Sequence, residues 1–276
     1  MKPIAYLALF NLFIALSPTL PLSHSALAVA DVPTFTFDQH LLVPVRVHLL
    51  RAKDAPNADC KLTPKDIERI WAKAQSIWHR AGIHLVLESI IEEEADNQAD
   101  YKALGENPDL PDHRQLRPMG TRGDKMFNVY YIHRFRVNGV YMDRASIFVQ
   151  DTARLGKVEG GIDEPLPRVT SHELGHGLGL PHRQDRTNLM ASGTTGTSLN
   201  DEEIMKARQT ASIFDWVQKP EQLAKQADEA FEAKKVKEAR ALYERLLAVP
   251  GESKLKDAAR KRVDQIAAVS GPNPEP

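Results

Sequence analysis

The sequence predicts an α+β fold that ends in a small helical appendage. Alternating apolar and polar residues predict strands at several places in the first half of the chain, and a segment with helical spacing separates the first two. From Lys219 onward the composition shifts to Ala, Lys, Glu and Leu with a helical period. A chain of 276 residues can bury one large core. We therefore expect one large domain over residues 31–218 and a helical region over residues 219–276.

The N-terminus has the three parts of a secretory signal. Lys2 precedes an apolar run from Ile4 to Leu16, and small residues follow from Ala26 to Ala30. The run is shorter than the ~20 apolar residues that a membrane-spanning helix needs. We therefore expect residues 1–30 to be a cleaved signal peptide, and the mature protein to be soluble in the periplasm or outside the cell. An uncleaved N-terminal anchor is the alternative.

A strand, a helix and a second strand follow in that order. Residues Pro44–Arg51 alternate with the period of a half-buried strand. Thr63 supplies a helix N-cap, Pro64 suits the first helical position, and Gly82 can end the helix in the left-handed conformation. Alternation resumes over Ile83–Ile90. Such a crossover places its two strands parallel in one sheet.

The middle of the chain predicts a surface insertion and two more strands. Residues 91–124 are polar and contain prolines, so we expect a long surface insertion. Met126–Phe135 and Val140–Gln150 are strand candidates, and the Asn138-Gly139 pair between them predicts a hairpin turn. Gly156–Pro167 contains three glycines and two prolines and predicts a loop, which ends just before a helix opens at Arg168.

Two further helical segments complete the chain. Leu199–Ile204 has the pattern of a capped helix start, with Asn200 as the cap and Glu203 reaching back to it. Beyond Lys219, the apolar residues fall near the spacing of one tetratricopeptide unit, a helix pair of ~34 residues. A single unit is rarely stable alone, so these helices should pack on the large domain or bind a protein partner. A helical appendage without a binding role is our preferred interpretation.

The charge balance argues against nucleic acid and anionic membranes as partners. The sequence has 36 Lys and Arg residues against 37 Asp and Glu residues, a formal net charge of -1, so no overall field attracts polyanions. Cys60 is the only cysteine and cannot form an internal disulfide. We interpret it as a structural residue, and the alternative is a latency thiolate that blocks a metal site.

Residues that can carry chemistry gather in the segment His172–His182, which reads HELGHGLGLPH. On a helix, His172 and His176 lie one turn apart on the same face, so both imidazoles can reach one metal ion. Glu173 lies near that face and can hydrogen-bond a metal-bound water without binding the metal itself. The pattern therefore predicts two ligands and a base of a zinc site.

A catalytic zinc needs a third protein ligand, which a straight helix cannot supply with tetrahedral geometry. Gly179 stands where a left-handed residue can end the helix, and Pro181 stiffens the return that brings in His182. Gly175 and Gly177 each cost the helix ~1 kcal/mol relative to alanine, which indicates close packing or close approach of a substrate. The predicted zinc ligands are His172, His176 and His182.

The segment resembles the metzincin signature, a long zinc-binding motif followed by a methionine-bearing turn, here at Met190. The resemblance covers roughly Pro44–Val217, although only residues 172–190 match a specific motif. It implies a metzincin-type domain with a mixed twisted sheet and helices, and a small lower lobe after the glycine. It also implies that Met190 forms an apolar floor beneath the metal ligands.

The resemblance further implies a zinc metalloendopeptidase that acts on proteins or peptides. Glu173 would be the general base, taking a proton from the zinc-activated water and passing it to the leaving amine. The strand around Ala145–Gln150 would lie at the cleft edge and pair with an extended substrate. A catalytically silent zinc module that presents the C-terminal helices to a partner is the alternative function.

Two residues depart from the better-known metzincin subfamilies and leave the subfamily unassigned. Arg183 follows the third histidine, and Ser192 stands where astacin-type and serralysin-type members carry a tyrosine. Some relatives bind structural calcium, and Asp163 and Glu164 offer suitable carboxylates, but we favour a flexible loop there. The remaining histidines lack ligand spacing and are interpreted as structural or solvent-exposed: His24, His40, His48, His79, His84, His113 and His133.

Overall fold

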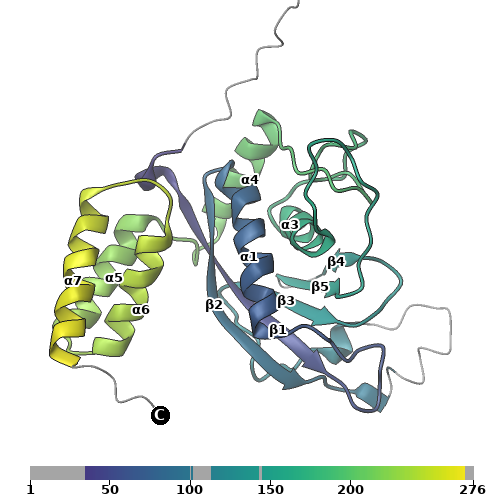
Figure 1. Cartoon of the computed structure of the whole chain (residues 1–276), viewed down its shortest axis with the longest axis horizontal. Helices are drawn as coiled ribbons and strands as arrows, with labels where there is room; N and C mark the ends of the chain where they lie inside the picture. The colour runs from purple at the N-terminus through teal and green to yellow at the C-terminus, as the bar shows by residue number, and fades with distance from the viewer. Residues whose placement is uncertain (1–34, 100, 102–112, 143–144, 271–276) are drawn as a thin grey trace, which may run out of the picture. The chain divides into compact units, whose positions relative to one another are not determined.

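A computed structural model describes residues 35–99, 101, 113–142 and 145–270 of the chain (Figure 1). The predicted signal peptide, residues 1–30, lies outside the described residues. Within the described part, no helix is both long and apolar enough to cross a membrane. The helices of this part are α1 (Pro64–His79), α3 (Pro165–Gly177), α4 (Asp201–Ile213), α5 (Pro220–Glu232), α6 (Val236–Ala248) and α7 (Lys254–Ser270), with short 3-10 helices η1 (Phe37–Gln39) and η2 (His113–Leu116).

Five strands form one mixed sheet in the order β2-β1-β3-β5-β4. Their bounds are β1 (Leu41–Arg51), β2 (Ile83–Glu94), β3 (Phe127–Ile132), β4 (Gly139–Tyr141) and β5 (Ser146–Gln150). The first four in this order run parallel, and β4 pairs antiparallel with β5 at the edge. The predicted parallel crossover from β1 through α1 to β2 is confirmed.

The local signals around α1 act as the sequence predicts. The Thr63 hydroxyl accepts a hydrogen bond from the backbone N–H of Asp66, and the Asp66 carboxylate accepts one from the backbone N–H of Thr63. This reciprocal pair satisfies two N–H groups that the first turn leaves without helical partners. Gly82 ends the segment with φ +60°, which a residue without a Cβ adopts at little cost.

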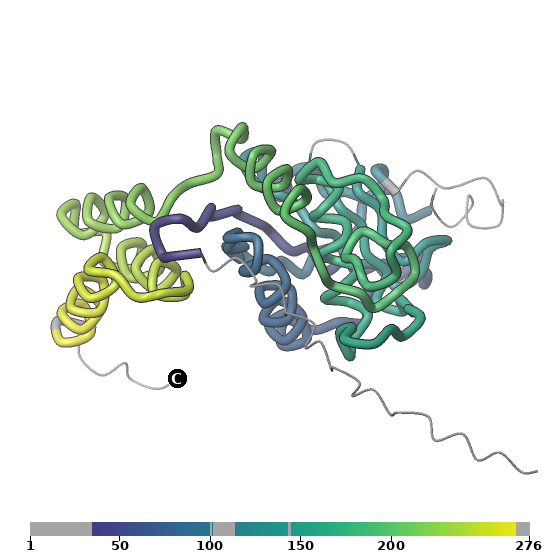
Figure 2. Tube along the Cα trace, turned by 90° about the horizontal axis from the view of Figure 1, so that it is seen from above, coloured from purple at the N-terminus to yellow at the C-terminus, as the bar shows by residue number. Residues whose placement is uncertain are grey.

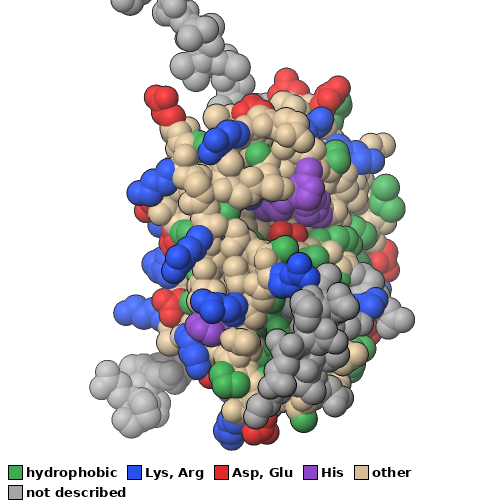
Figure 3. All heavy atoms as spheres, turned by 90° about the vertical axis from the view of Figure 1, so that its right-hand side faces the viewer, with side chains coloured by type: hydrophobic (Ala, Val, Ile, Leu, Met, Phe, Trp, Pro, Cys, Tyr) green, Lys and Arg blue, Asp and Glu red, His purple; other side chains and the backbone are tan. Residues whose placement is uncertain are grey.

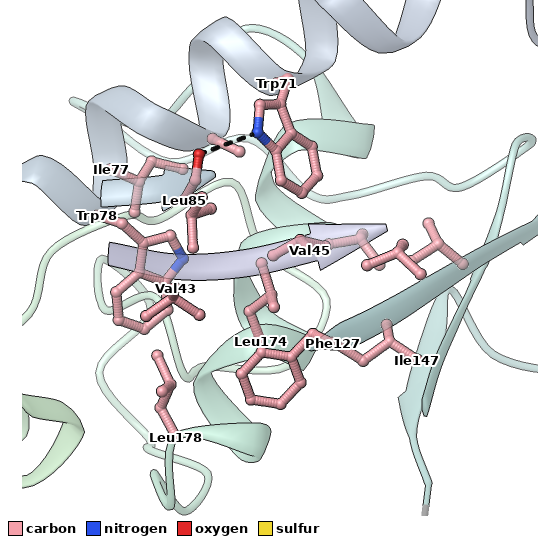
Figure 4. Close-up of a cluster of buried hydrophobic side chains, with 14 of the residues drawn as sticks. Val43, Val45, Trp71, Ile77, Trp78, Leu85, Phe127, Ile147, Leu174 and Leu178 are labelled. Carbon is pink, nitrogen blue, oxygen red and sulfur yellow. Dashed lines mark hydrogen bonds between the residues drawn. The ribbon is translucent and has the colours of Figure 1, made fainter. Parts of the chain in front are cut away.

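Helices α1 and α3 lie on the same face of the sheet and bury the main core with it (Figure 1). Figure 4 shows Trp78 of α1 and Leu174 of α3 directed toward the strand side chains, among them Val43. The indole N–H of Trp71 donates to the backbone carbonyl of Leu85 in β2 (3.4 Å). The core therefore fixes α3, which carries the histidine motif, against a rigid layer.

The predicted hairpin turn at Asn138-Gly139 is wrong. Gly139 is the first residue of β4, and the single strand predicted over Val140–Gln150 is broken into β4 and β5, which pair with each other. Ala145, just before β5, has φ 55°. An alternating pattern does not reveal that a chain reverses within it, because both arms keep the same period. On this side of the sheet the edge strand is consequently β4, and the segment Ala145–Gln150 lies inside the sheet.

β1 is buried on both faces rather than half-buried. Its His48 is 0% exposed, with Nδ1 2.5 Å from Oε1 of Glu93 and Nε2 3.2 Å from Oδ1 of Asn128. Part of the predicted surface insertion covers this face, since Leu116 is buried there and β2 extends to Glu94. In β1 the polar residue His48 is therefore a buried side chain with hydrogen-bond partners, and it does not face solvent.

Three helices follow α4, where the sequence predicted a pair (Figure 2). Helices α5 and α6 pack against each other, and α7 packs on α6. Their apolar cluster also includes Phe37, Leu42 and Val86 from the first half of the chain. Arg245 of α6 pairs with Glu88 of β2 (2.8 Å). The preferred interpretation, an appendage without a binding role, and the alternative, binding of a protein partner, both stay predictions.

Candidate metal centre

Helix α3 carries the first two predicted ligands and the predicted base. It begins at Pro165, earlier than the predicted start at Arg168, because proline needs no N–H partner in the first turn. His172 and His176 lie one turn apart on this helix, and Glu173 follows the first of them. His172 and Glu173 are each only 5% exposed, so the helix aims both side chains into the protein.

A tight turn after α3 delivers the third histidine. Gly179 has φ +82°, and its N–H donates to the carbonyl of His176 (3.0 Å), while the N–H of Leu180 donates to the carbonyl of Gly175 (2.9 Å). This pair of bonds is the Schellman motif, which reverses the chain at a left-handed glycine. The predicted helix end is confirmed, and it returns His182 toward the helix.

The three imidazoles converge on one point. The Nε2 atom of His176 lies 3.1 Å from Nε2 of His172 and 3.2 Å from Nε2 of His182. The Nδ1 atoms of His172 and His176 lie 2.8 and 2.9 Å from the carbonyls of Leu189 and Leu180. Nδ1 of His172 also lies 3.2 Å from a guanidinium nitrogen of Arg168, but the carbonyl is nearer. Because a carbonyl only accepts, we assign the proton of each ring to Nδ1, which leaves a bare lone pair at each Nε2. Facing lone pairs repel, so the cluster calls for a cation between them.

The geometry of this cluster fits zinc. Tetrahedral coordination with Zn–N bonds of ~2.0–2.1 Å separates two ligand nitrogens by ~3.3 Å, close to the 3.1 and 3.2 Å found here. Burial lowers the pKa of His172 to about 3, so its ring is neutral near pH 7. Among the described residues, these three histidines are the group of His, Cys, Asp or Glu side chains placed to hold a metal. Three ligands leave one tetrahedral position open.

Glu173 is a buried carboxylate next to the histidine cluster. Burial raises the pKa of Glu173 to about 7, while a hydrogen bond from the backbone of Tyr141 and the charge of Arg168 act in the opposite direction. A carboxylate with a pKa near neutrality can both take and return a proton at physiological pH. Strand β4 thus reaches the predicted base directly.

Gly139 makes this close approach of β4 possible. A Cβ placed on Gly139 would lie 2.8 Å from Cγ of Glu173 and 2.6 Å from Cγ1 of Val169. Contacts under 3.0 Å do not occur at real Cβ atoms. The Asn138-Gly139 pair predicts a turn, and no local signal connects Gly139 with Glu173.

Met190 lies beneath α3, in the turn that follows the third histidine. It is 0% exposed, and a Cβ on Gly175 would lie 2.6 Å from its Sδ atom. The inference that Gly175 marks close packing is therefore correct, and its neighbour is Met190. A Cβ on Gly177 would likewise lie 2.5 Å from a ring carbon of Phe127.

Arg168 is a buried residue of this site. Its sequence position predicts only the start of a helix. It is 2% exposed, its Nε donates to the carbonyl of Gly196 (3.2 Å), and another guanidinium nitrogen donates to the carbonyl of Ala191. Burial lowers the pKa of Arg168 to about 10, so it stays charged at pH 7. It ties the loop after the third histidine to α3. The sequence signal that could have indicated this role is the place of the arginine, one helical turn before the first histidine.

An open cleft of about 370 Å³ adjoins the histidines. Glu173 and His182 lie on one side of it, and Val137, Leu155 and Gly193 contribute to its remaining walls. Figure 3 shows the same arrangement on the surface, where histidine side chains gather beside a hollow that contains an acidic side chain. His172 and His182 therefore face a cleft that is open to solvent.

Comparisons with known proteins find only weak similarity. No protein-family model and no curated protein matches the sequence. Metalloproteinase-II from Bacteroides fragilis aligns with a TM-score of 0.36 and 11% identity over 64% of this chain and 55% of that one. A chaperone–substrate complex gives the same two values over 64% of this chain and 35% of that one. A zinc-dependent peptidase from Methanocorpusculum labreanum (strain Z) gives a TM-score of 0.30 and 11% identity over 60% and 99%.

The aligned region thus spans only about half of the Bacteroides protein and a third of the chaperone complex chain. Two of these three weak structural neighbours are metallopeptidases.

The loop considered for calcium makes ion pairs with α1. Asp163 lies 2.7 Å from the ammonium of Lys73, and Glu164 pairs with Lys73 (3.1 Å) and with Arg69. Cys60 is 1% exposed within the main core, where burial raises the pKa of its thiol to about 12. A thiol of this kind is poorly suited to act as a latency thiolate, because the thiolate is the metal-binding form.

A second group of histidines lies where α1 meets β2. Nε2 of His79 lies 3.0 Å from Nδ1 of His84, and the two rings stack, with the ring of His40 6.1 Å from that of His79. Burial lowers the pKa of His79 to about 4 and that of His84 to about 3. These residues pair with each other inside the fold, in agreement with the structural role expected for them.

Proposed function

We propose that this protein is an exported, zinc-dependent endopeptidase of the metzincin type with its catalytic domain over residues 31–218. The observation that carries the proposal is the convergence of the Nε2 atoms of three imidazoles beside a buried carboxylate, at the wall of an open cleft. Zinc would be held by His172, His176 and His182. Bound there, it supplies Lewis-acid chemistry, lowering the pKa of water toward ~7 and polarising a scissile carbonyl.

Glu173 is proposed to move the protons of the reaction. Its carboxylate takes a proton from the attacking water and delivers it to the amine that leaves when the peptide bond breaks. Its position suits both halves of this cycle, since the carboxylate is buried beside the histidines and lines the cleft. Met190 is proposed as the apolar support beneath the ligands, in keeping with its contact with α3.

Strand β4 is proposed to bind the substrate backbone. The N–H of Met142 and the carbonyl of Asn138 bond to β5, so in an antiparallel ladder the backbone groups of Gly139 and Tyr141 face away from β5. The Tyr141 N–H bonds to Glu173, so the backbone groups proposed to meet the substrate are those of Gly139. An extended peptide can add to such an edge through main-chain hydrogen bonds. This assigns the substrate class as unfolded or loop segments of proteins.

The variant Glu173→Gln tests the proposal. It should bind one zinc ion per chain and lose cleavage of casein by ~100- to 10,000-fold, because the amide cannot take a proton. The matched control is Glu159→Gln in an exposed loop position, which should cleave at the wild-type rate. Retained cleavage by Glu173→Gln would remove this residue from the proposed role.

Zinc binding and cleavage by the wild-type protein distinguish the proposed endopeptidase from the alternative function. Zinc-loaded wild-type protein that cleaves none of a proteome-derived peptide library would favour a silent zinc module that presents α5, α6 and α7 to a partner. Failure of the wild-type protein to bind zinc would remove both. The proposed export is tested by the mass of the protein recovered outside the cytoplasm, which should lack residues 1–30.

A further inference from the structure

His182 is the proposed ligand that packing holds least. It is exposed, whereas His172 is buried and His176 half-buried. The Nδ1 atoms of His172 and His176 are fixed by backbone carbonyls. Among the residues that the structure describes, nothing bonds to Nδ1 of His182. Its position must therefore come from the chain on either side of it.

The next residue, Arg183, is fixed at both its backbone and its side chain. Its N–H donates to the carbonyl of Met190 (3.0 Å), which ties the segment that carries His182 to the methionine turn. Its guanidinium Nε donates to Oε1 of Glu203 on α4 (2.7 Å). Arg183 is the residue that departs from the better-known metzincin subfamilies, and this contact supplies its partner.

Glu203 connects three separate segments through one carboxylate. Its side chain is only 1% exposed. Oε1 accepts from Arg183, and Oε2 accepts from the side-chain amide of Asn188 (2.8 Å) and from the backbone N–H of Asn200 (2.9 Å). A carboxylate is buried at high cost unless such partners compensate it, so the arrangement is fixed once formed.

The network continues to the methionine turn. Oδ1 of Asn188 accepts from the N–H of Met190 (2.7 Å). A continuous set of bonds therefore runs from Arg183 through Glu203 and Asn188 to Met190, with His182 at one end. Displacing Glu203 would release both the segment that carries His182 and the methionine turn.

We propose that Arg183 and Glu203 are positioning residues for the third zinc ligand, so that helix α4 sets the affinity of the site for its metal. The inference rests on the proposed function only in taking zinc as the ion. Partners that orient a metal ligand from outside the coordination sphere typically change metal affinity by ~10- to 100-fold when removed. The competing explanation is that Glu203 serves only the N-terminal cap of α4, where it pairs with Asn200.

The test measures the zinc dissociation constant by competition with a chelating dye at fixed pH, without any substrate. Arg183→Met and Glu203→Gln should each weaken zinc binding about tenfold or more. The double variant should be no weaker than the weaker single variant, since both changes break the same contact. Arg183→Lys, which keeps the charge, should recover part of the affinity.

Asn200→Ala is the matched control, because it removes the side-chain half of the cap and leaves Arg183 and Glu203 in contact. It should lower the melting temperature and leave the zinc dissociation constant unchanged. Wild-type affinity in Arg183→Met, or an equal loss in Asn200→Ala, would overturn the inference. If Glu203→Gln fails to fold, Arg183→Met decides the test. The Arg183 side chain is 38% exposed, so its replacement should not prevent folding. A wild-type protein without zinc affinity would instead sink the proposed function.

Discussion

At the scale of single residues, the site depends on a glycine that contacts the proposed base from another element. Gly139 leaves room for the Glu173 side chain, and two residues later the Tyr141 backbone bonds to the same carboxylate. The base is thus held between α3 and the edge strand. Its orientation is as sensitive to β4 as to its own helix.

Gly139→Ala should therefore lower the rate of peptide cleavage by about 100-fold, as expected for a catalytic group displaced by about 1 Å. The added Cβ would lie 2.8 Å from Cγ of Glu173 and must push it aside. Zinc stoichiometry and KM should stay near wild type, since neither the histidines nor the outward backbone groups change. Gly120→Ala is the control, because a Cβ there has nothing within 4 Å. A loss confined to KM would contradict this account.

The sequence predicted some residues of the candidate site and missed others for a physical reason. The histidine spacing and the left-handed Gly179 follow from helix geometry within a few residues, so a short segment contains all the information. Gly139 and Arg168 matter through contacts between segments that are distant in the chain. Their local patterns, a turn and a helix start, say nothing of those contacts.

At the scale of elements, histidines are buried in the neutral form at the junction of α1 and β2. Burial lowers the pKa of His79 to about 4 and that of His84 to about 3, and the charges of neighbouring histidines act in the same direction. The unfolded chain binds these protons near pH 6.5 and the folded chain does not. Folding stability should therefore fall as the pH drops below about 6.5.

The expected loss is on the order of 1 kcal/mol or more for each histidine between pH 7 and pH 4.5. Urea unfolding of metal-free protein at a series of pH values measures it. His79→Gln keeps a donor for His84 and should flatten the pH dependence. An unchanged slope in this variant would show that other groups take up the protons.

Helices were predictable where their first or last residues carry a cap or stop signal. Thr63, Gly82 and Asn200 are caps and stops that act through neighbouring backbone groups, and the helices they bound appear where expected. The strands β4 and β5 were read as one because the pattern of alternation does not contain the reversal between them. α7 was missed because the repeat spacing described a pair of helices only.

At the scale of the whole chain, the C-terminal helices share an apolar cluster with residues of η1, β1 and β2. Phe37, Leu42 and Val86 are 2%, 2% and 7% exposed beside α5, α6 and α7. Without these helices the three side chains would meet water. Each would then cost on the order of 1.5 kcal/mol or more.

Deleting residues 219–276 should accordingly lower the melting temperature and the solubility of the protein, while zinc still binds at the histidines. Differential scanning calorimetry and zinc titration measure the two effects. Ile213→Ser, at a side chain that is 77% exposed, is the control and should change neither. A truncated protein as stable as the full chain would mean that the helices are independent of the sheet.

The edge strand β4 contains three residues, Gly139–Tyr141. A longer bare edge would be a template on which strands from other chains could stack into aggregates. With so few outward groups, and one of them directed to Glu173, accidental pairing gains little energy. We therefore expect this short edge to favour pairing with a single peptide segment over stacking of strands from other copies of the chain.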